Sequence, residues 1–230
     1  MKQWDRYDAY LFDIDGTLLH CTDAVHYFAF CDALTAIVGT PMNLDGVVAH
    51  GNVDTGILRD ALMRTSLPEH FWRPKLQAAK LAMCAQVEKN KHDLCAEPTP
   101  RAAELLQHLR GRGAKLGVAT GNLQVIGRLK LAHCGLLQHF DFAGWSDDYE
   151  YRKDVFAHAL EQAKKHIGET ATVCVVGDTP ADVLAAQANG LDVIAVATGT
   201  YTMEQLQQAQ PTWCVRSFDE LLPPVTAANR

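Results

Sequence analysis

This sequence is short of positive charge. Its 21 Lys and Arg residues are outnumbered by 27 Asp and Glu residues, which gives a net charge of −6. A protein that binds nucleic acid by neutralising phosphates needs the opposite balance, and no local cluster of basic residues supplies it. The composition therefore argues against a nucleic acid as the partner.

Cysteine pairs and long apolar runs are lacking as well. The seven cysteines are odd in number and scattered, and no two of them form a Cys-x-x-Cys pair, so neither a disulfide framework nor a zinc site is indicated. No uninterrupted apolar run comes near the ~18 residues that span a bilayer, and the N-terminus carries no apolar signal segment. We expect a soluble, cytoplasmic protein with reduced thiols and no membrane partner.

The sequence does contain short apolar runs that alternate with helical patterns. Of its 230 residues, 48% are hydrophobic and 21% are charged, as in an ordinary globular protein. Helical spacing follows Thr99-Pro100 and Thr179-Pro180, where a capping residue precedes a proline. This alternation predicts an α/β fold with a doubly wound, mainly parallel, Rossmann-like sheet. The expected strands are residues 7–12, 115–119, 140–143, 172–176 and 193–196.

One interval interrupts the alternation. Roughly 100 residues separate the first expected strand from the second, whereas a crossover with its helix needs little more than ~12. The residues between them show helix-like apolar spacing and almost no strand pattern. We therefore expect an inserted α-helical cap at residues 18–97, on a catalytic core formed by residues 1–17 and 98–230. The return linker is expected at residues 96–100, where prolines stiffen a hinge.

Polar residues follow several of the expected strands. Asp13 and Asp15 end the first strand, Thr120 ends the second, and Asp178 ends the strand at 172–176. In a parallel sheet these positions converge on one edge. Clustered carboxylates need a counter-ion, and oxygen ligands suit a hard divalent cation, most simply Mg²⁺. The backbone amides at Gly16-Thr17 and Gly121-Asn122 are expected to bind an anion there. Together these features indicate phosphate chemistry.

Two motifs then make the chain resemble the haloacid dehalogenase superfamily of aspartyl-phosphate hydrolases. Residues 13–18, Asp-Ile-Asp-Gly-Thr-Leu, are similar to its D-x-D-G-T-L signature, and residues 177–182 to its G-D-x-x-x-D motif. The resemblance spans roughly residues 7–220. It implies Asp13 as nucleophile and metal ligand, and Asp15 as acid/base and as a ligand through its carbonyl. It implies Asp178 as the remaining ligand, and Asp182 as the residue that orients the metal shell or the basic residue.

The third motif departs from the commonest pattern of the family. Many relatives carry Lys-Pro there, whereas this chain has Arg152-Lys153-Asp154. The resemblance implies that a basic residue contacts the phosphoryl group. We favour Arg152 and keep Lys153 as the alternative. Thr120 and Gly121 are implied as phosphate-binding residues at the end of the second strand.

The cap loop departs from the family pattern too. Residues 51–54, Gly-Asn-Val-Asp, are similar to the G-[KR]-T-D loop of phosphoglycolate-phosphatase-like caps but lack its basic residue. That difference leaves the usual substrate assignments open. His20, His50 and Asn52 are candidates for reaching a substrate from the cap.

The resemblance implies a Mg²⁺-dependent phosphatase that hydrolyses a small phosphomonoester through an aspartyl-phosphate. The expected partner is a small phosphorylated metabolite, and the oligomeric state is open. A phosphomutase would share every core residue and stays an alternative. A receiver-like phospho-acceptor module is an alternative of a different class, although the large insertion counts against it. A dehalogenase is disfavoured, because displacing a halide needs neither a metal nor an acid for the leaving group.

Overall fold

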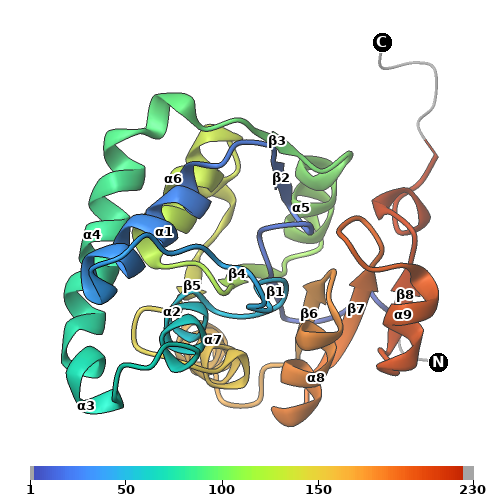
Figure 1. Cartoon of the computed structure of the whole chain (residues 1–230). Helices are drawn as coiled ribbons and strands as arrows, with labels where there is room; N and C mark the ends of the chain where they lie inside the picture. Colours follow the sequence, from blue (N-terminus) through green and yellow to red (C-terminus); the bar gives the residue numbers. More distant parts are fainter. Residues whose placement is uncertain (1–2, 225–230) are drawn as a thin grey trace.

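The fold is built around a six-stranded parallel sheet (Figure 1). The structure, a computed structural model, describes residues 3–224. The strand order is β5-β4-β1-β6-β7-β8, so the chain extends the sheet from β1 first to one side and then to the other. A crevice at the carboxyl ends of the strands is expected beside β1, where the winding reverses. The strands are β1 (Ala9–Phe12), β4 (Lys115–Ala119), β5 (Phe142–Gly144), β6 (Val173–Gly177), β7 (Asp192–Val196) and β8 (Trp213–Val215).

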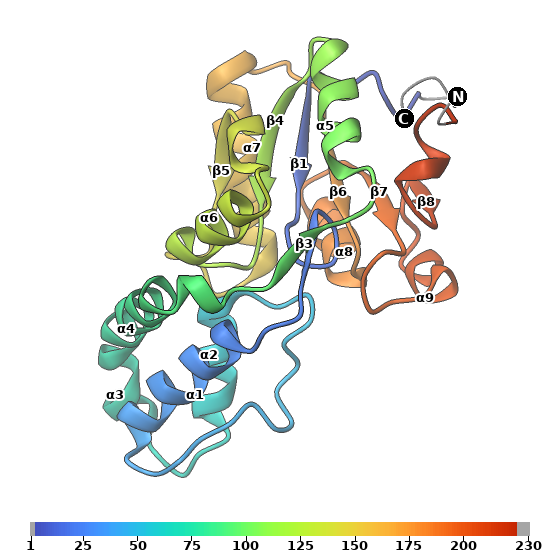
Figure 2. The same cartoon turned by 90° about the horizontal axis from the view of Figure 1, so that it is seen from above.

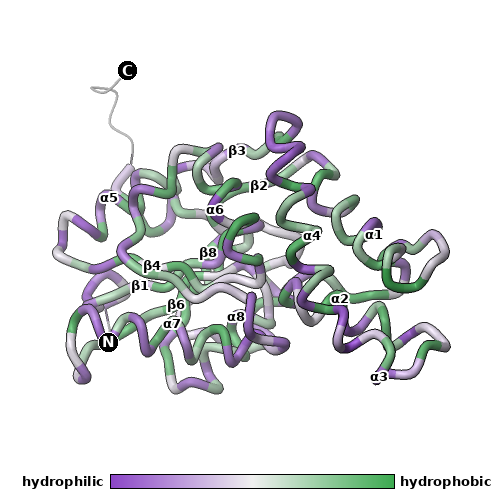
Figure 3. The backbone as a smooth tube through the Cα atoms, turned by 90° about the vertical axis from the view of Figure 1, so that its left-hand side faces the viewer, coloured by the Kyte–Doolittle hydropathy of each residue, from purple (hydrophilic) through white to green (hydrophobic). Residues whose placement is uncertain are grey.

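Helices cover both faces of this sheet, as seen along its edge in Figure 3. Alternate strand residues point to opposite faces. Tyr10 and Phe12 of β1 pack with helices α5 and α6, whereas Ala9 and Leu11 pack with α7, α8 and α9. Two apolar layers therefore hold the sheet, as the doubly wound prediction requires. The helices are α5 (Ala102–Gly111), α6 (Gln124–His133), α7 (Arg152–Ile167), α8 (Pro180–Ala188) and α9 (Met203–Gln208), with short 3₁₀ turns η3 (Leu137–His139) and η4 (Phe218–Glu220).

A helical segment between β1 and β4 lies to one side of the sheet (Figure 2). It has its own apolar core, in which Leu34, Leu58 and Met83 are fully buried. Leu123 and Ile126 of the sheet-bound part join the same cluster, so the segment packs over the start of α6. Its elements are α1 (Val25–Val38), α2 (Asp54–Met63), α3 (Glu69–Trp72), η1 (Arg73–Lys75), α4 (Leu76–Lys89) and η2 (Lys91–Asp93).

The chain enters and leaves this segment through a two-stranded antiparallel ribbon. Strand β2 (Leu19–Cys21) pairs with β3 (Ala96–Pro98). We expected almost no strand in residues 18–97 and a proline linker at residues 96–100, so the ribbon is a correction. Strands of three residues are too short for a period of two to show in a sequence. We propose the boundaries between core and cap at this ribbon, at residues 17/18 and 97/98.

The predicted fold class is confirmed, with differences at the edges of the sheet. The expected strand at 115–119 has the same bounds as β4, whereas the expected strand at 140–143 begins two residues too early. Strand β8 and helix α9 were not anticipated, because they have only three and six residues. Within residues 3–224, no helix has both the length and the apolar character needed to cross a membrane.

Candidate active site

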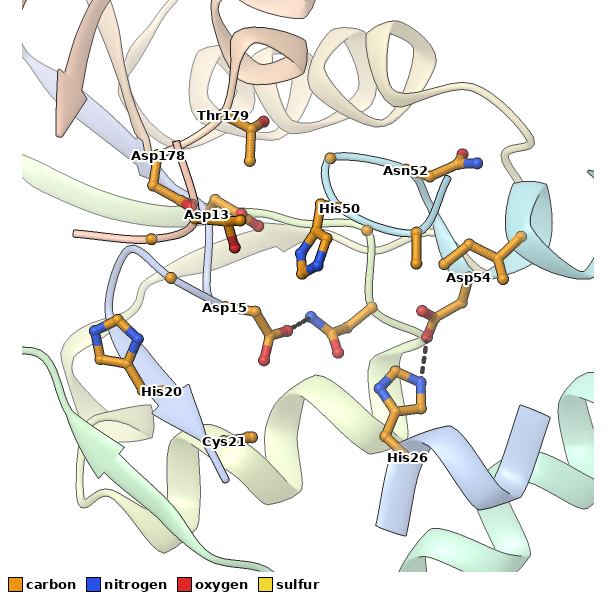
Figure 4. Close-up of a pocket in the computed structure, with 18 of the residues that line it drawn as sticks. Asp13, Asp15, His20, Cys21, His26, His50, Asn52, Asp54, Asp178 and Thr179 are labelled. Carbon is orange, nitrogen blue, oxygen red and sulfur yellow. Dashed lines mark hydrogen bonds and ion pairs between the residues drawn. The ribbon is translucent and has the colours of Figure 1, made fainter. Parts of the chain in front are cut away.

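A cavity of about 520 Å³ lies at the carboxyl ends of β1 and β6. Asp13, Asp15 and Asp178 of the core line it together with His50 and Asn52 of the cap (Figure 4). The cavity therefore joins the residues expected to perform chemistry with residues expected to reach a substrate. Most small-ligand sites in open α/β sheets occupy this position.

Asp13 follows β1 directly and is held by an arginine. Its side chain is only 7% exposed, and its Oδ2 lies 2.9 Å from Nη2 of Arg152. Arg152 lies in the first turn of α7, where it is buried as well. Its Nε and Nη2 donate to Oδ1 of Asp182 at 2.9 and 2.6 Å. One guanidinium thus bridges two buried carboxylates, a geometry for which its planar fork is suited.

The two basic candidates of the third motif have different surroundings. Arg152 lines the cavity and faces Asp13, whereas Lys153 is exposed to solvent and does not line it. The reason is helical geometry, because successive residues of α7 point about 100° apart. Arg152 therefore remains our candidate for the phosphoryl contact.

Asp178 follows β6 and packs against backbone. Its Oδ1 accepts a hydrogen bond of 2.9 Å from the Thr17 hydroxyl. A Cβ added at Gly16 or at Gly199 would collide with its carboxylate, and Gly16 also has a φ of +81°. Both glycines are thus required by the close approach of the Asp178 carboxylate.

Three carboxylates come close enough to share a cation. One oxygen from each of Asp13, Asp178 and Asp182 lies within 4.8 Å of the others. Asp182, however, already accepts from Arg152 through Oδ1 and from the hydroxyl and amide of Thr179 through Oδ2. The oxygens of Asp13 and Asp178 therefore fit a hard cation better, and the all-oxygen donor set suits Mg²⁺. Asp182 holds the arginine and caps α8.

The protonation of this cluster points the same way. Burial raises the pKa of Asp13 above its ordinary range, against the opposing effect of Arg152. Burial also raises the pKa of Asp178, and the neighbouring Asp13 carboxylate adds to that shift. When both carboxyl groups are ionised, their negative charges repel each other. A bound divalent cation would balance these charges and favour the ionised forms.

Asp15 has a different environment from Asp13. Both of its carboxylate oxygens lie 2.9 Å from Nζ of Lys130, and Oδ2 also accepts a hydrogen bond of 2.7 Å from Asn122. Burial acts to raise the pKa of Asp15, but the charge and hydrogen bond of Lys130 outweigh it and hold this pKa below its ordinary range. The two aspartates of one motif are thus separated electrostatically.

The expectation that the amides of Gly16 and Thr17 bind an anion is wrong. The Gly16 amide donates to the Leu19 carbonyl at 2.9 Å, and the Thr17 amide donates to the Ile14 carbonyl at 3.3 Å. Both amides are used to close the turn after β1. The tight return of the chain into β2, which the sequence analysis did not anticipate, makes the Leu19 carbonyl available, and the Ile14 carbonyl belongs to the turn itself.

The loop after β4 also uses its polar groups internally. The fully buried Thr120 hydroxyl accepts from the Asn122 side chain at 2.9 Å and from its amide at 3.3 Å. Gly121 and Asn122 line the cavity, whereas Thr120 does not. A phosphate contact through Thr120 or Gly121 stays a prediction.

The cap loop expected near a substrate docks tightly on the core. The amide of Asp54 donates to the Gly121 carbonyl at 2.7 Å. Oδ2 of Asp54 accepts from the Leu123 amide at 2.8 Å. A Cβ at Gly121 would collide with the carbonyl of Asn52. The side chain of Asn52 turns away to Asp60, with Nδ2 to Oδ2 at 3.0 Å. Asn52 therefore faces the cavity through its backbone.

The sequence analysis gave no functional role to His26, to Lys130 or to the side chain of Asn122, and it noted Asp54 only as part of the cap loop. Lys130 had a detectable signal, because it lies four residues after Ile126 on the buried side of a helix, where an unpaired lysine is rare. Asp54 had a signal as the last residue of the cap loop, whereas His26 had none, since the lysine and the carboxylate beside it are far away in sequence. His20 and His50 line the cavity as expected.

Comparisons with known proteins find similar sequences and similar folds. The model of the haloacid dehalogenase-like hydrolases matches residues 7–190. "Probable phosphatase IndB" of Dickeya dadantii is 32% identical over 123 residues, so that the match spans about half of each chain. A phosphoglycolate phosphatase of Agrobacterium fabrum is 26% identical over 93% of this chain and 90% of its own length. The solved structure of CbbY from Rhodobacter sphaeroides in complex with phosphate has the same fold, with a TM-score of 0.70 and 21% identity over 94% of this chain and 96% of its own.

The contacts of Arg152 generate a first prediction. Arg152→Lys should lower kcat/KM for a phosphomonoester by ~10²–10³-fold, because a point charge does not replace two directed donors. Lys153→Ala should change it by no more than about twofold. Steady-state kinetics measures both, with thermal unfolding to verify that each variant folds. The opposite ranking would assign the phosphoryl contact to Lys153.

The raised pKa values of Asp13 and Asp178 generate a second prediction. Because Mg²⁺ needs ionised ligands and the protonated forms persist toward neutral pH, the affinity for Mg²⁺ should increase with pH over roughly pH 6–9, with release of protons. Calorimetric titration in buffers of different ionisation enthalpy measures both effects. Asp178→Asn should weaken binding strongly, whereas the surface variant Asp148→Asn should not. An unchanged titration for Asp178→Asn would exclude Asp178 as a ligand.

Proposed function

The chain belongs to the haloacid dehalogenase-like hydrolase family, and we propose that it is a Mg²⁺-dependent phosphatase of small phosphomonoesters that works through an aspartyl-phosphate on Asp13. One observation carries the proposal most directly. Two aspartates of one motif lie in the same cavity with different partners, Asp13 against Arg152 and Asp15 against Lys130. Two carboxyl groups that lie in one cavity with different partners can take the different roles of nucleophile and acid/base.

In the first half-reaction, the Asp13 carboxylate attacks phosphorus and the ester oxygen leaves. Arg152 would bind the equatorial oxygens of the transferring group, since its Nη2 already lies beside Asp13. Asp15 in its protonated form would give its proton to the leaving alcohol. Mg²⁺ held by Asp13, the Asp15 carbonyl and Asp178 would neutralise phosphoryl charge.

In the second half-reaction, water hydrolyses the acyl phosphate on Asp13. The Asp15 carboxylate takes a proton from the attacking water, which returns Asp15 to its acid form and releases phosphate. Lys130 and Asn122 favour the ionised form of Asp15, so they favour this step. The cap closes the cavity from the other side and limits the access of bulk water.

The alternatives differ in what supports them. Membership of the hydrolase family and the large helical insertion argue against a receiver-like module. A phosphomutase would use the same residues of the core and stays an alternative. The cytoplasmic location is still a prediction from composition.

The two aspartates give the test of this function. Asp13→Asn should abolish turnover of every phosphomonoester, because an amide does not form the aspartyl-phosphate. Asp15→Asn should lower kcat for an alkyl phosphate by ~10²–10⁴-fold, and less for p-nitrophenyl phosphate, whose leaving group needs no proton. Stopped-flow absorbance should show a burst of p-nitrophenolate from Asp15→Asn and none from Asp13→Asn. If Asp15→Asn gives no burst and loses as much on both substrates, the acid/base assignment is wrong.

The charges of the cavity predict the kind of leaving group. Among its described lining residues, the two with a fixed positive charge are Lys130 and Arg152, and both are paired with aspartates. A second anionic group on the substrate would lie in a cavity that has no unpaired lysine or arginine among its described lining residues. Its burial there would weaken the binding of that substrate. We therefore expect kcat/KM for glycerol phosphate to exceed that for phosphoglycolate or pyrophosphate by about tenfold or more. A panel assay with Mg²⁺ measures this, and a preference for phosphoglycolate would contradict it.

A further inference from the structure

A series of polar side chains leads from Asp15 out of the core and into the cap. Its members are Asp15 after β1, Lys130 on α6, and His26 and Asp54 on the cap helices α1 and α2. All four line the cavity. Apart from the effect of Lys130 on the pKa of Asp15, none of the last three has a role in the mechanism described above.

Lys130 is the centre of this series. Its side chain is 4% exposed, and Nζ lies 2.9 Å from both oxygens of Asp15. The same atom donates to Oδ1 of Asn122 at 2.9 Å and lies 3.2 Å from Nδ1 of His26. An ammonium has three protons, and these partners use them all. The position of Lys130 is therefore fixed from both the core and the cap.

His26 connects this lysine with the cap carboxylate. Its ring stacks on Phe30 with centroids 4.9 Å apart, and Nε2 lies 3.2 Å from Oδ2 of Asp54. With its proton on Nε2, the ring leaves Nδ1 available to accept from Lys130, while Nε2 faces the Asp54 carboxylate without making a hydrogen bond of good geometry. Asp54 in turn accepts from the Leu123 amide at the start of α6. Both ends of the series are thus attached to the helix that carries Lys130.

A purely structural role explains this arrangement poorly. Burying a lysine is expensive, and a well-packed apolar side chain at such a site is often as stabilising as an ion pair. Ile126, one turn earlier on the same face of α6, is such an apolar residue and is fully buried. What the ammonium adds at position 130 is a directed contact with both oxygens of Asp15.

We propose that Lys130 is a positioning residue that fixes the orientation of the Asp15 carboxylate, and that His26 of the cap helps to hold Lys130 in place. The orientation of the acid/base then depends on the docking of the cap, because His26 and Asp54 reach α6 only from a docked cap. This inference rests on the proposed function for its consequence in catalysis, but not for the geometry of Asp15.

The first test replaces the ammonium without leaving a hole. Lys130→Met should lower kcat for an alkyl phosphate by ~10–100-fold with KM within about twofold, because Asp15 loses part of its acid–base effect while phosphate binding persists. The loss should be smaller for p-nitrophenyl phosphate, with a burst of p-nitrophenolate. Arg128→Met is the matched control, since it removes an exposed cation from the same helix and should leave both substrates unaffected.

Rescue by a soluble cation separates positioning from packing. In Lys130→Ala, ethylammonium should restore kcat for the alkyl phosphate several-fold, whereas n-propanol of similar size should not. Equal rescue by both, or a loss that is the same on both substrates, would overturn the proposal.

The contribution of the cap is tested by a double-mutant cycle. His26→Leu should lower kcat for the alkyl phosphate less than Lys130→Met does, and the double variant should lose little more than Lys130→Met alone. Strictly multiplicative losses would overturn the role of His26.

A readout that does not need turnover distinguishes this inference from the proposed function. Crystal structures of the wild type and of Lys130→Met should differ in the side-chain torsion of Asp15, with Asp13 and Arg152 unmoved. An unchanged Asp15 would overturn the inference even in an active enzyme. A wild-type protein that hydrolyses no phosphomonoester would reject the function, while a displaced Asp15 would still support the positioning.

Discussion

Negative charge buried at one edge of an apolar sheet is the constraint to which the other parts of the molecule respond. Asp13, Asp178 and Asp182 lie within a few ångströms of each other, at the ends of strands whose side chains are mostly apolar. Such charges persist in a protein interior only with cations beside them. Arg152 comes from the helices on one face of the sheet and Lys130 from those on the other. The sheet itself keeps the two cations apart.

This separation gives two neighbouring aspartates different chemical properties. Asp13 shares its cation with Asp182 and keeps a raised pKa, whereas Asp15 receives a lysine through both oxygens and keeps a lowered one. In the sequence, Asp13 and Asp15 are two identical acids two residues apart, and nothing in the motif itself distinguishes their pKa values. Their different cation partners come from helices that follow more than 100 residues later in the chain.

The sequence was sufficient to predict most strands of the sheet and the polar residues that follow them. Apolar runs long enough to show a pattern, such as β4 and β6, predicted their own bounds closely, and the aspartates after them needed only the rule that parallel strands end at one edge. The three-residue strands β2, β3 and β8 were missed because they have no detectable period. His26, and the contact of Asp54 with it, were missed for a different reason. The contacts of these two side chains form only when the cap packs on α6. A single sequence does not indicate that packing, so it does not predict these contacts.

The ribbon of β2 and β3 has a consequence for how such a protein can diversify. Because the chain leaves the core and returns to it on paired strands, the two junctions are separated by about one interstrand spacing of ~5 Å. A short turn can bridge that distance, so the whole segment between the strands is exchangeable without breaking the sheet. Any replacement cap must cover Leu123 and Ile126. These two residues lie at the start of α6 in the core, and the present cap helices bury them fully. A different cap is compatible with this core provided that it brings its own apolar surface to that one helix end.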